Sequence, residues 1–283
     1  MAIVISTANC PEEVKNKLRQ EEKYLKSLGI TFDVEEDFRE GYTFFEIDYM
    51  GEDSNNLKES LADVVAEIVV DNMENQFINK IIQENYSEFD AREKEQIEKF
   101  TLQHLDSGNY NSDFVSRMLR KREIIKKLLN YLDNNQDLNI EGFVRFRLKD
   151  YLRKLKIAVD RAADDYLLEN EYNEFIDLLS YFVELQEPRV NLVNVLKLDD
   201  ESFQLLDLNH NIINDNYLEG YVSEIMEEEV DFEDLLISAL INIAPASIVL
   251  HFQDNRVEQT IKNIFGNMVT VCEGCSLCEK AKL

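Results

Sequence analysis

Glycine and proline are scarce in this sequence, with 8 and 3 copies respectively. An all-β protein needs many turns built on these residues, so their scarcity argues against that class. The abundant leucine, glutamate, lysine and isoleucine favour helices instead. Hydrophobic residues make up 45% of the 283 positions, which is enough to bury a core and excludes a disordered chain.

The scarcity of glycine also argues against two common nucleotide-binding sites. No two glycines stand in a G-x-G pattern, and no G-x-x-x-x-G-K-[ST] motif occurs. Such loops need glycine so that backbone N–H groups can approach a phosphate. The three histidines, His104, His210 and His251, form no H-E-x-x-H motif, and no G-x-S-x-G motif is present. The sequence therefore predicts no catalytic residue and favours a non-enzymatic protein.

Basic residues are the minority, and they are concentrated in one stretch. The net charge is −27, but residues 111–161 carry +6, between flanks of −14 (1–110) and −19 (162–283). We expect the acidic flanks to pair with this stretch, and the alternative is a site for a polyanion such as a nucleic acid. The candidate polyanion-binding residues are Arg117, Arg120, Lys121, Arg147, Lys154 and Arg161. Phe143 and Phe146 fall outside the apolar face of their helix and are candidates for contact with a partner.

Three of the four cysteines stand close together near the end of the sequence. Cys272, Cys275 and Cys278 follow a C-x₂-C-x₂-C pattern, whose two-residue gaps let a turn bring thiolates onto one soft metal ion. The same spacing begins the run that ligates iron–sulfur clusters. A closed zinc site needs a fourth ligand, for which Cys10, His251 or a group from a second chain are the candidates. The alternatives are free thiols and a redox or intersubunit disulfide role.

No membrane span and no targeting segment are expected. The long uncharged stretch Leu235–Phe252 contains Pro245 and His251, so it predicts a buried helix, a turn and a buried strand. Met1–Cys10 lacks the basic start of a signal peptide. Four cysteines without a secretion signal indicate a reducing compartment, and we expect the cytoplasm.

Hydrophobic periodicity predicts a predominantly helical α+β fold in three parts. Residues 1–55 form a small β-α-β-β unit, residues 56–187 a central helical bundle, and residues 188–283 a C-terminal α/β unit with a cysteine-rich tail. The first part is predicted to contain strands Ala2–Ser6, Ile30–Val34 and Tyr42–Tyr49, with a helix that Gly29 ends. The central helices are predicted at Leu57–Tyr86, as one long helix or two short ones, and at Ala91–Leu105, Ser112–Leu132, Asn139–Leu168 and Glu171–Leu185.

In the last part, hydrophobic residues recur with a period of two in some segments and of 3.6 in others, which predicts strands and helices in turn. Strands are predicted at Val190–Leu198, Ser202–Leu208, Ser247–Phe252 and Met268–Cys272. Helices are predicted at Tyr217–Met226, Phe232–Ile243 and Asn255–Phe265.

Four segments of this chain are similar to those of a known family. They are Glu141–Leu152 (EGFVRFRLKDYL), Tyr166–Ile176 (YLLENEYNEFI), Val183–Pro188 (VELQEP) and Glu233–Pro245 (EDLLISALINIAP). In these segments the chain resembles the YtxC-like sporulation proteins of endospore-forming Firmicutes, over roughly residues 57–283. The resemblance implies an uncharacterised cytoplasmic protein linked to sporulation, and it brings no catalytic residue with it.

Three hypotheses about function follow. The leading one is a non-enzymatic interaction or regulatory protein that binds a protein partner, such as a second copy of the chain, through the helical centre. The second is a protein that binds zinc or an iron–sulfur cluster through the C-terminal cysteines. The third is a nucleic-acid-binding protein that uses the basic helices.

Overall fold

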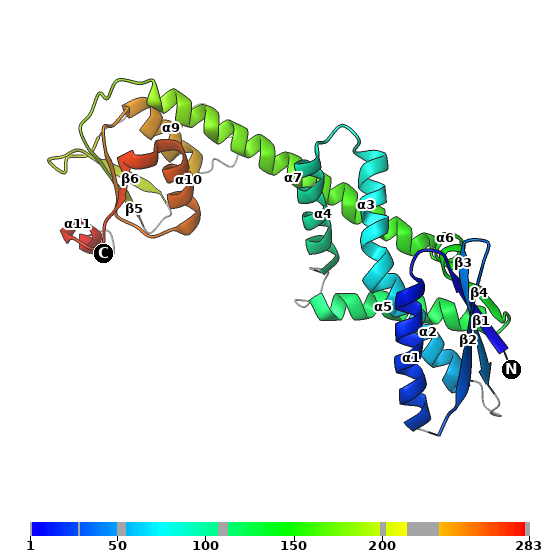
Figure 1. Cartoon of the computed structure of the whole chain (residues 1–283). Coiled ribbons are helices and arrows are strands. Elements are labelled where there is room, and N and C mark those ends of the chain that lie inside the picture. The colour runs from blue at the N-terminus through cyan, green and yellow to red at the C-terminus, as the bar shows by residue number, and fades with distance from the viewer. Residues whose placement is uncertain are drawn as a thin grey trace. The chain divides into compact units, whose positions relative to one another are not determined.

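The computed structural model describes residues 2–27, 29–49, 55–106, 113–198, 202–213 and 232–280 (Figure 1). Contacts divide the chain into a first unit, Met1–Leu168, and a second unit, Glu169–Leu283. The described residues are mostly helical, with two small mixed sheets, which confirms the predicted α+β class. Among them no helix has a run long and apolar enough to cross a membrane. The division into three parts stays a prediction.

The sheet of the first unit has the order β2-β3-β1-β4. Its strands are β1 (Ala2–Thr7), β2 (Phe32–Arg39), β3 (Tyr42–Tyr49) and β4 (Asp137–Asn139). The helix α1 (Pro11–Ser27) completes the β-α-β-β order predicted from the sequence. β4 was not predicted. It pairs parallel to β1, with Leu138 opposite Ile5, and so joins residues far apart in the sequence.

The end of α1 shows how the sequence fixes this unit locally. Gly29 has a φ of +80°, and its N–H donates to the carbonyl of Lys26 while that of Ile30 donates to Leu25. This pair of bonds is the Schellman motif, which glycine favours because it lacks a Cβ atom. The predicted role of Gly29 is therefore confirmed.

Helices cover this sheet and continue beyond it. They are α2 (Asn55–Ile68), a π-helical turn η1 (Val69–Met73), α3 (Glu74–Asn85), α4 (Ala91–Asp106), α5 (Asp113–Leu132), α6 (Ile140–Arg147) and α7 (Lys149–Glu184). The apolar face of α2 that was predicted from helical spacing is buried against the strands, including Leu61, Val65 and Ile68.

The predicted break near residue 170 is wrong, because α7 is one helix of 36 residues. It passes from the first unit into the second. Asn170 does not interrupt it, because its side chain donates to Glu174 one turn further on. The break lies instead at Leu148, which separates α6 from α7. α6 begins at Ile140, directly after Asn139, whose side chain accepts from the N–H of Gly142 and caps the helix.

The second unit has a sheet of order β6-β5-β7-β8. Its strands are β5 (Val193–Lys197), β6 (Phe203–Leu206), β7 (Ile248–Leu250) and β8 (Val269–Val271). β5, β7 and β8 run parallel, and β6 is antiparallel to β5. The helices α9 (Phe232–Ile243) and α10 (Asn255–Phe265) have the predicted bounds, followed by a 3-10 turn η2 (Gly266–Met268) and the short α11 (Ser276–Lys280). The predicted helix Tyr217–Met226 lies outside the described residues.

Candidate metal centre

The C-terminal cysteines and one histidine meet at one edge of the second sheet. His251 directly follows β7 and Cys272 directly follows β8. Neighbouring parallel strands end at the same edge, so these two side chains are brought together. Backbone bonds fix both positions: the N–H of His251 donates to Val195 at 2.9 Å, and that of Cys272 donates to Leu250 at 2.9 Å.

A tight turn returns the chain from Cys272 to the same edge. Gly274 has a φ of +139°, a conformation that residues with a Cβ rarely adopt. Cys275 stands just before α11 and Cys278 within it. Leu277, between them, packs on Leu196 and Leu206 of the sheet, so α11 is held by its own small apolar cluster.

The four donor atoms lie at distances that suit one metal ion. The Nδ1 of His251 is 3.4 Å from the Sγ of Cys275 and 3.4 Å from that of Cys278. These two sulfurs are 3.8 Å apart, and all four donors, with Cys272, lie within 4.8 Å of one another. Tetrahedral Zn²⁺, with Zn–S near 2.3 Å and Zn–N near 2.0 Å, requires about 3.8 Å between sulfurs and about 3.6 Å between nitrogen and sulfur. The donor set therefore fits a single Zn²⁺ ion.

Asn194 of β5 orients the imidazole. Its amide Nδ2 donates to the backbone carbonyl of Asp207, so its Oδ1 is turned toward His251. The Nε2–H of His251 then donates to that Oδ1 at 3.0 Å. With the proton on Nε2, the lone pair of Nδ1 faces the thiols. Metal-binding histidines are commonly held in this way by a second hydrogen bond.

The ionisation of these groups also suits a metal ligand. Burial, with a smaller effect of the charge on His210, lowers the pKa of His251 and favours the neutral ring. Backbone hydrogen bonds from Cys278 and Leu277 lower the pKa of Cys275. Burial raises the pKa of Cys278.

The distances between the donor atoms favour a single metal ion over an iron–sulfur cluster, both of which the cysteine spacing allowed. The protein ligands of an iron–sulfur cluster are divided among two or four irons, so the whole donor set is spread more widely than around one ion. Donors within 4.8 Å of one another favour the single ion. Four protein ligands also leave no open position for substrate, which is typical of structural rather than catalytic zinc.

Cys10, another candidate for the fourth ligand, lies in the first unit. It is buried, and its Sγ is 3.2 Å from the Oγ1 of Thr7. Burial raises the pKa of Cys10 and keeps it a thiol. The structure groups His251, and not Cys10, with the three C-terminal cysteines.

Four of the six candidate polyanion-binding residues form ion pairs within the first unit. Arg117 pairs with Asp71, Arg120 with Glu74 and Asp106, Lys121 with Asp63 and Glu67, and Lys154 with Glu123. The other two differ: the guanidinium of Arg147 lies 5.8 Å from the ring centre of Tyr131, and Arg161 is exposed. Polyanion binding stays a prediction, and it would require most of these ion pairs to break.

The acidic partners form a stripe that the charge totals did not reveal. Asp63, Glu67 and Asp71 recur every four residues along α2 and η1, which face α5. Burial alone would raise the pKa of Glu67, but its hydrogen bond with Lys17 and the charge of Lys121 outweigh that effect and lower it. The four-residue spacing of these acidic residues was the sequence signal that could have placed them on one helical face.

One aromatic prediction near this stretch is wrong. Phe143 is buried and packs edge-to-face on Tyr131, with ring centres 5.5 Å apart. It fell outside the predicted apolar face because the helix break at Leu148 turns α6 relative to α7. Phe146 is 65% exposed, as expected.

Comparison with known proteins gives a family and one curated relative. A model of the YtxC-like family matches residues 59–270. The "Uncharacterized protein YtxC" of Bacillus subtilis (strain 168) is 26% identical over 201 residues, which cover 69% of this chain and 70% of the relative. No solved structure matches. The family match includes Asn194 and His251 but ends before the three cysteines.

Proposed function

This chain belongs to the YtxC-like family, and from its donor set we propose that it is a non-enzymatic protein that binds one Zn²⁺ ion through His251, Cys272, Cys275 and Cys278. The observation that carries this proposal is the agreement of the nitrogen–sulfur and sulfur–sulfur distances, 3.4 and 3.8 Å, with one tetrahedral ion.

The role of the ion would be structural. Bound Zn²⁺ would supply four strong bonds that join the ends of β7 and β8 to α11. The chain's own residues prepare this site: Asn194 holds the imidazole, Gly274 permits the turn, and Leu277 holds α11 on the sheet. A helix of five residues is too short to be stable by itself, so it depends on such anchors.

The proposed cellular role rests on the resemblance to the YtxC-like sporulation proteins. We infer that the protein acts in the cytoplasm of sporulating cells and binds a partner rather than transforming a substrate. Deletion of the gene should reduce the number of heat-resistant spores, because a partner would lose its regulator. A normal spore count after deletion would contradict this role.

Metal analysis of the purified protein tests the proposal directly. Protein prepared with reductant and without chelator should contain about one Zn²⁺ per chain by mass spectrometry of metals, because four ligands define a single site. The double substitution Cys275→Ser with Cys278→Ser should remove it, whereas Cys10→Ser should not. Wild-type protein that remains metal-free after incubation with Zn²⁺ would contradict the proposal, and iron with sulfide in anaerobic preparations would identify a cluster instead.

A milder variant tests how the site is built. Asn194→Ala keeps all four ligands but removes the hydrogen bond to His251. It should therefore still bind Zn²⁺, with an affinity about 10- to 100-fold lower in competition with a chromophoric chelator. Unchanged affinity would show that Asn194 does not position the histidine.

A further inference from the structure

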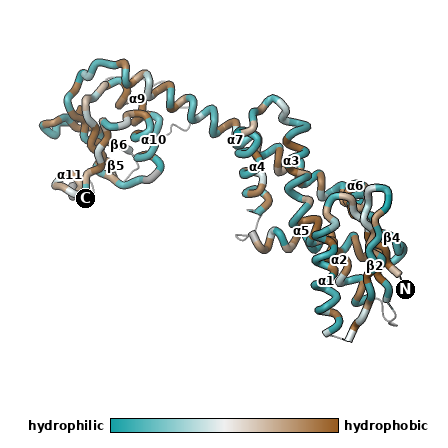
Figure 2. The backbone as a smooth tube through the Cα atoms, viewed as in Figure 1, coloured by the Kyte–Doolittle hydropathy of each residue, from teal (hydrophilic) through white to brown (hydrophobic). Residues whose placement is uncertain are grey.

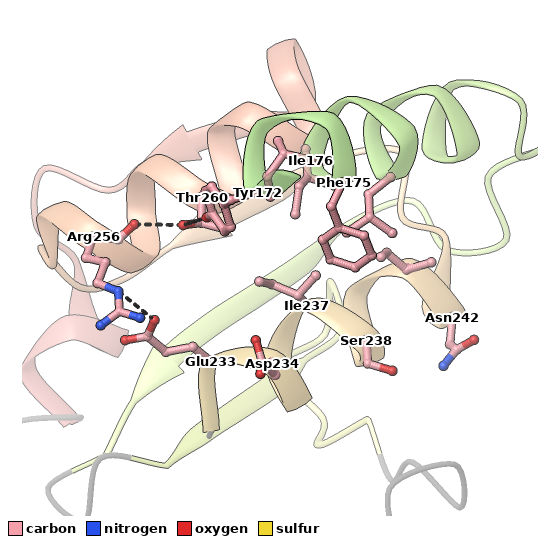
Figure 3. A pocket seen from close by; sticks show the side chains of 13 residues that line it. Tyr172, Phe175, Ile176, Glu233, Asp234, Ile237, Ser238, Asn242, Arg256 and Thr260 are labelled. Carbon is pink, nitrogen blue, oxygen red and sulfur yellow. Dashed lines mark hydrogen bonds and ion pairs between the residues drawn. The ribbon is translucent and has the colours of Figure 1, made fainter. Parts of the chain in front are cut away.

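A second feature of the second unit lies apart from the metal ligands. A groove of about 400 Å³ runs between α7, α9 and α10 (Figure 3). Isoleucines from all three helices line it, among them Ile176 of α7, Ile237 of α9 and Ile264 of α10. In Figure 3 the ring of Phe175 and the side chain of Ile237 point toward the same space. A volume in this range is typical of sites that accept apolar groups.

Large apolar side chains on α7 extend this surface. Tyr172 and Phe175, which line the groove, are 48% and 56% exposed. Leu178, one turn on from Phe175, is 63% exposed. Figure 2 shows hydrophobic and hydrophilic residues interspersed along α7, and Tyr181 and Phe182 further along this helix are also at least half exposed. Contiguous exposed apolar surface of this kind commonly marks a binding site.

The charge around the groove is negative. Glu233 and Asp234 line it, and Glu171, which precedes the lining residue Tyr172 on α7, is exposed. Arg256 is the cation among the lining residues, and its Nε lies 3.6 Å from Glu233. Within the described part of the chain, Asp234 has no ion-pair partner. Residues 169–283 carry 23 acidic and 6 basic side chains, a net charge of −17.

We propose that this groove binds an amphipathic helix whose apolar face is flanked by lysine or arginine. Leucine-like side chains at positions i, i+3, i+4 and i+7 of such a helix would enter between α7 and α9. Its cations would meet Asp234 and Glu171, which accelerates association and excludes acidic partners. A second copy of this surface is disfavoured, because it would bring like charges together.

The inference is independent of the proposed metal function. The metal ligands lie at the sheet edge, on His251 and the three C-terminal cysteines, and none of these residues lines the groove. Loss of metal binding and loss of peptide binding are therefore measured separately.

Fluorescence anisotropy with model peptides tests this surface on the full-length protein. One labelled peptide of about five helical turns contains leucine and lysine at amphipathic spacing, and a second has glutamate in place of lysine. The lysine peptide should bind at least about tenfold more tightly than the glutamate peptide, because only it satisfies both the apolar and the charge requirement. No saturable binding of the lysine peptide would overturn the inference.

Two matched variants separate the groove from general charge attraction. Phe175→Lys and Phe146→Lys each replace a phenylalanine that is more than half exposed by the same cation. Of the two, only Phe175 lines the groove. Phe175→Lys should weaken binding of the lysine peptide at least about tenfold, and Phe146→Lys less than about twofold. Equal weakening would show that only net charge matters and would overturn the inference. So would a dimer in analytical ultracentrifugation that Phe175→Lys abolishes, because a second copy would then be the occupant.

Discussion

Removal of Zn²⁺ should lower the melting temperature of the second unit by on the order of 15 °C. Free Zn²⁺ at about 1,000 times its dissociation constant stabilises the folded state by about 4 kcal/mol, and about 1 kcal/mol shifts the melting temperature of a domain near 100 residues by about 4 °C. The effect is large because β7 and β8 have only three residues each and α11 has five. The proposed ion would tie all three together.

Thermal unfolding and hydrogen exchange together would locate this effect. Full-length protein is melted with and without excess chelator, and exchange is followed by mass spectrometry. Amides of Val269–Val271 and Ser276–Lys280 should lose protection on chelation, whereas those of β1 and β3 in the first unit should not. The double variant Cys275→Ser with Cys278→Ser serves as the control, because chelator should not change its melting temperature further. A chelator-insensitive wild type that has been shown to contain Zn²⁺ would contradict the structural role.

Replacement of Glu74 by leucine should destabilise the first unit by about 3–5 kcal/mol. Glu74 is 4% exposed, and its carboxylate accepts hydrogen bonds from Arg120 and from the hydroxyl of Tyr151. Burial and the charge of Glu74 both raise the pKa of Tyr151, which therefore stays a donor. Arg120 is also largely buried and donates to the carbonyl of Leu105 at 2.7 Å. Without Glu74, its charge would lose its main partner inside the protein, which is the costly step.

Urea unfolding of matched variants would separate this network from ordinary surface pairs. The double variant Glu74→Leu with Arg120→Met should recover most of the lost stability, because it removes both buried charges. Glu123→Leu breaks the pair with Lys154, in which both side chains are 58% exposed, and should cost less than about 1 kcal/mol. Equal effects of Glu74→Leu and Glu123→Leu would show that burial does not make the network special.

Sequence patterns located elements whose signals are local. The bounds of α9 and α10 were predicted because apolar residues recur at helical spacing between clear ends, such as Asp254, which caps α10 through its side chain. α7 was predicted as part of two helices divided near Asn170, whereas the side chain of Asn170 bonds to Glu174 within one continuous helix. β4 has one apolar residue among three, Leu138, so no alternation could reveal it.

The candidate metal centre was predictable only in part. The spacing of Cys272, Cys275 and Cys278 indicated a soft-metal site, and two strand ends made His251 one of the candidates for the fourth ligand. The choice between His251 and Cys10 required the order of the parallel strands. Asn194 gave no signal, because a single amide in an apolar strand carries no spacing pattern and acquires its role from contacts across the sheet.

The parallel pairing of β4 with β1 has a consequence for biosynthesis. The amino-terminal sheet takes its fourth strand from residues 137–139, which leave the ribosome long after β1 has emerged. Until then the outer edge of β1 has unpaired backbone groups that other nascent chains can bind. Co-translational folding of this region therefore cannot finish until about half of the polypeptide has been translated, and the exposed edge must be protected meanwhile.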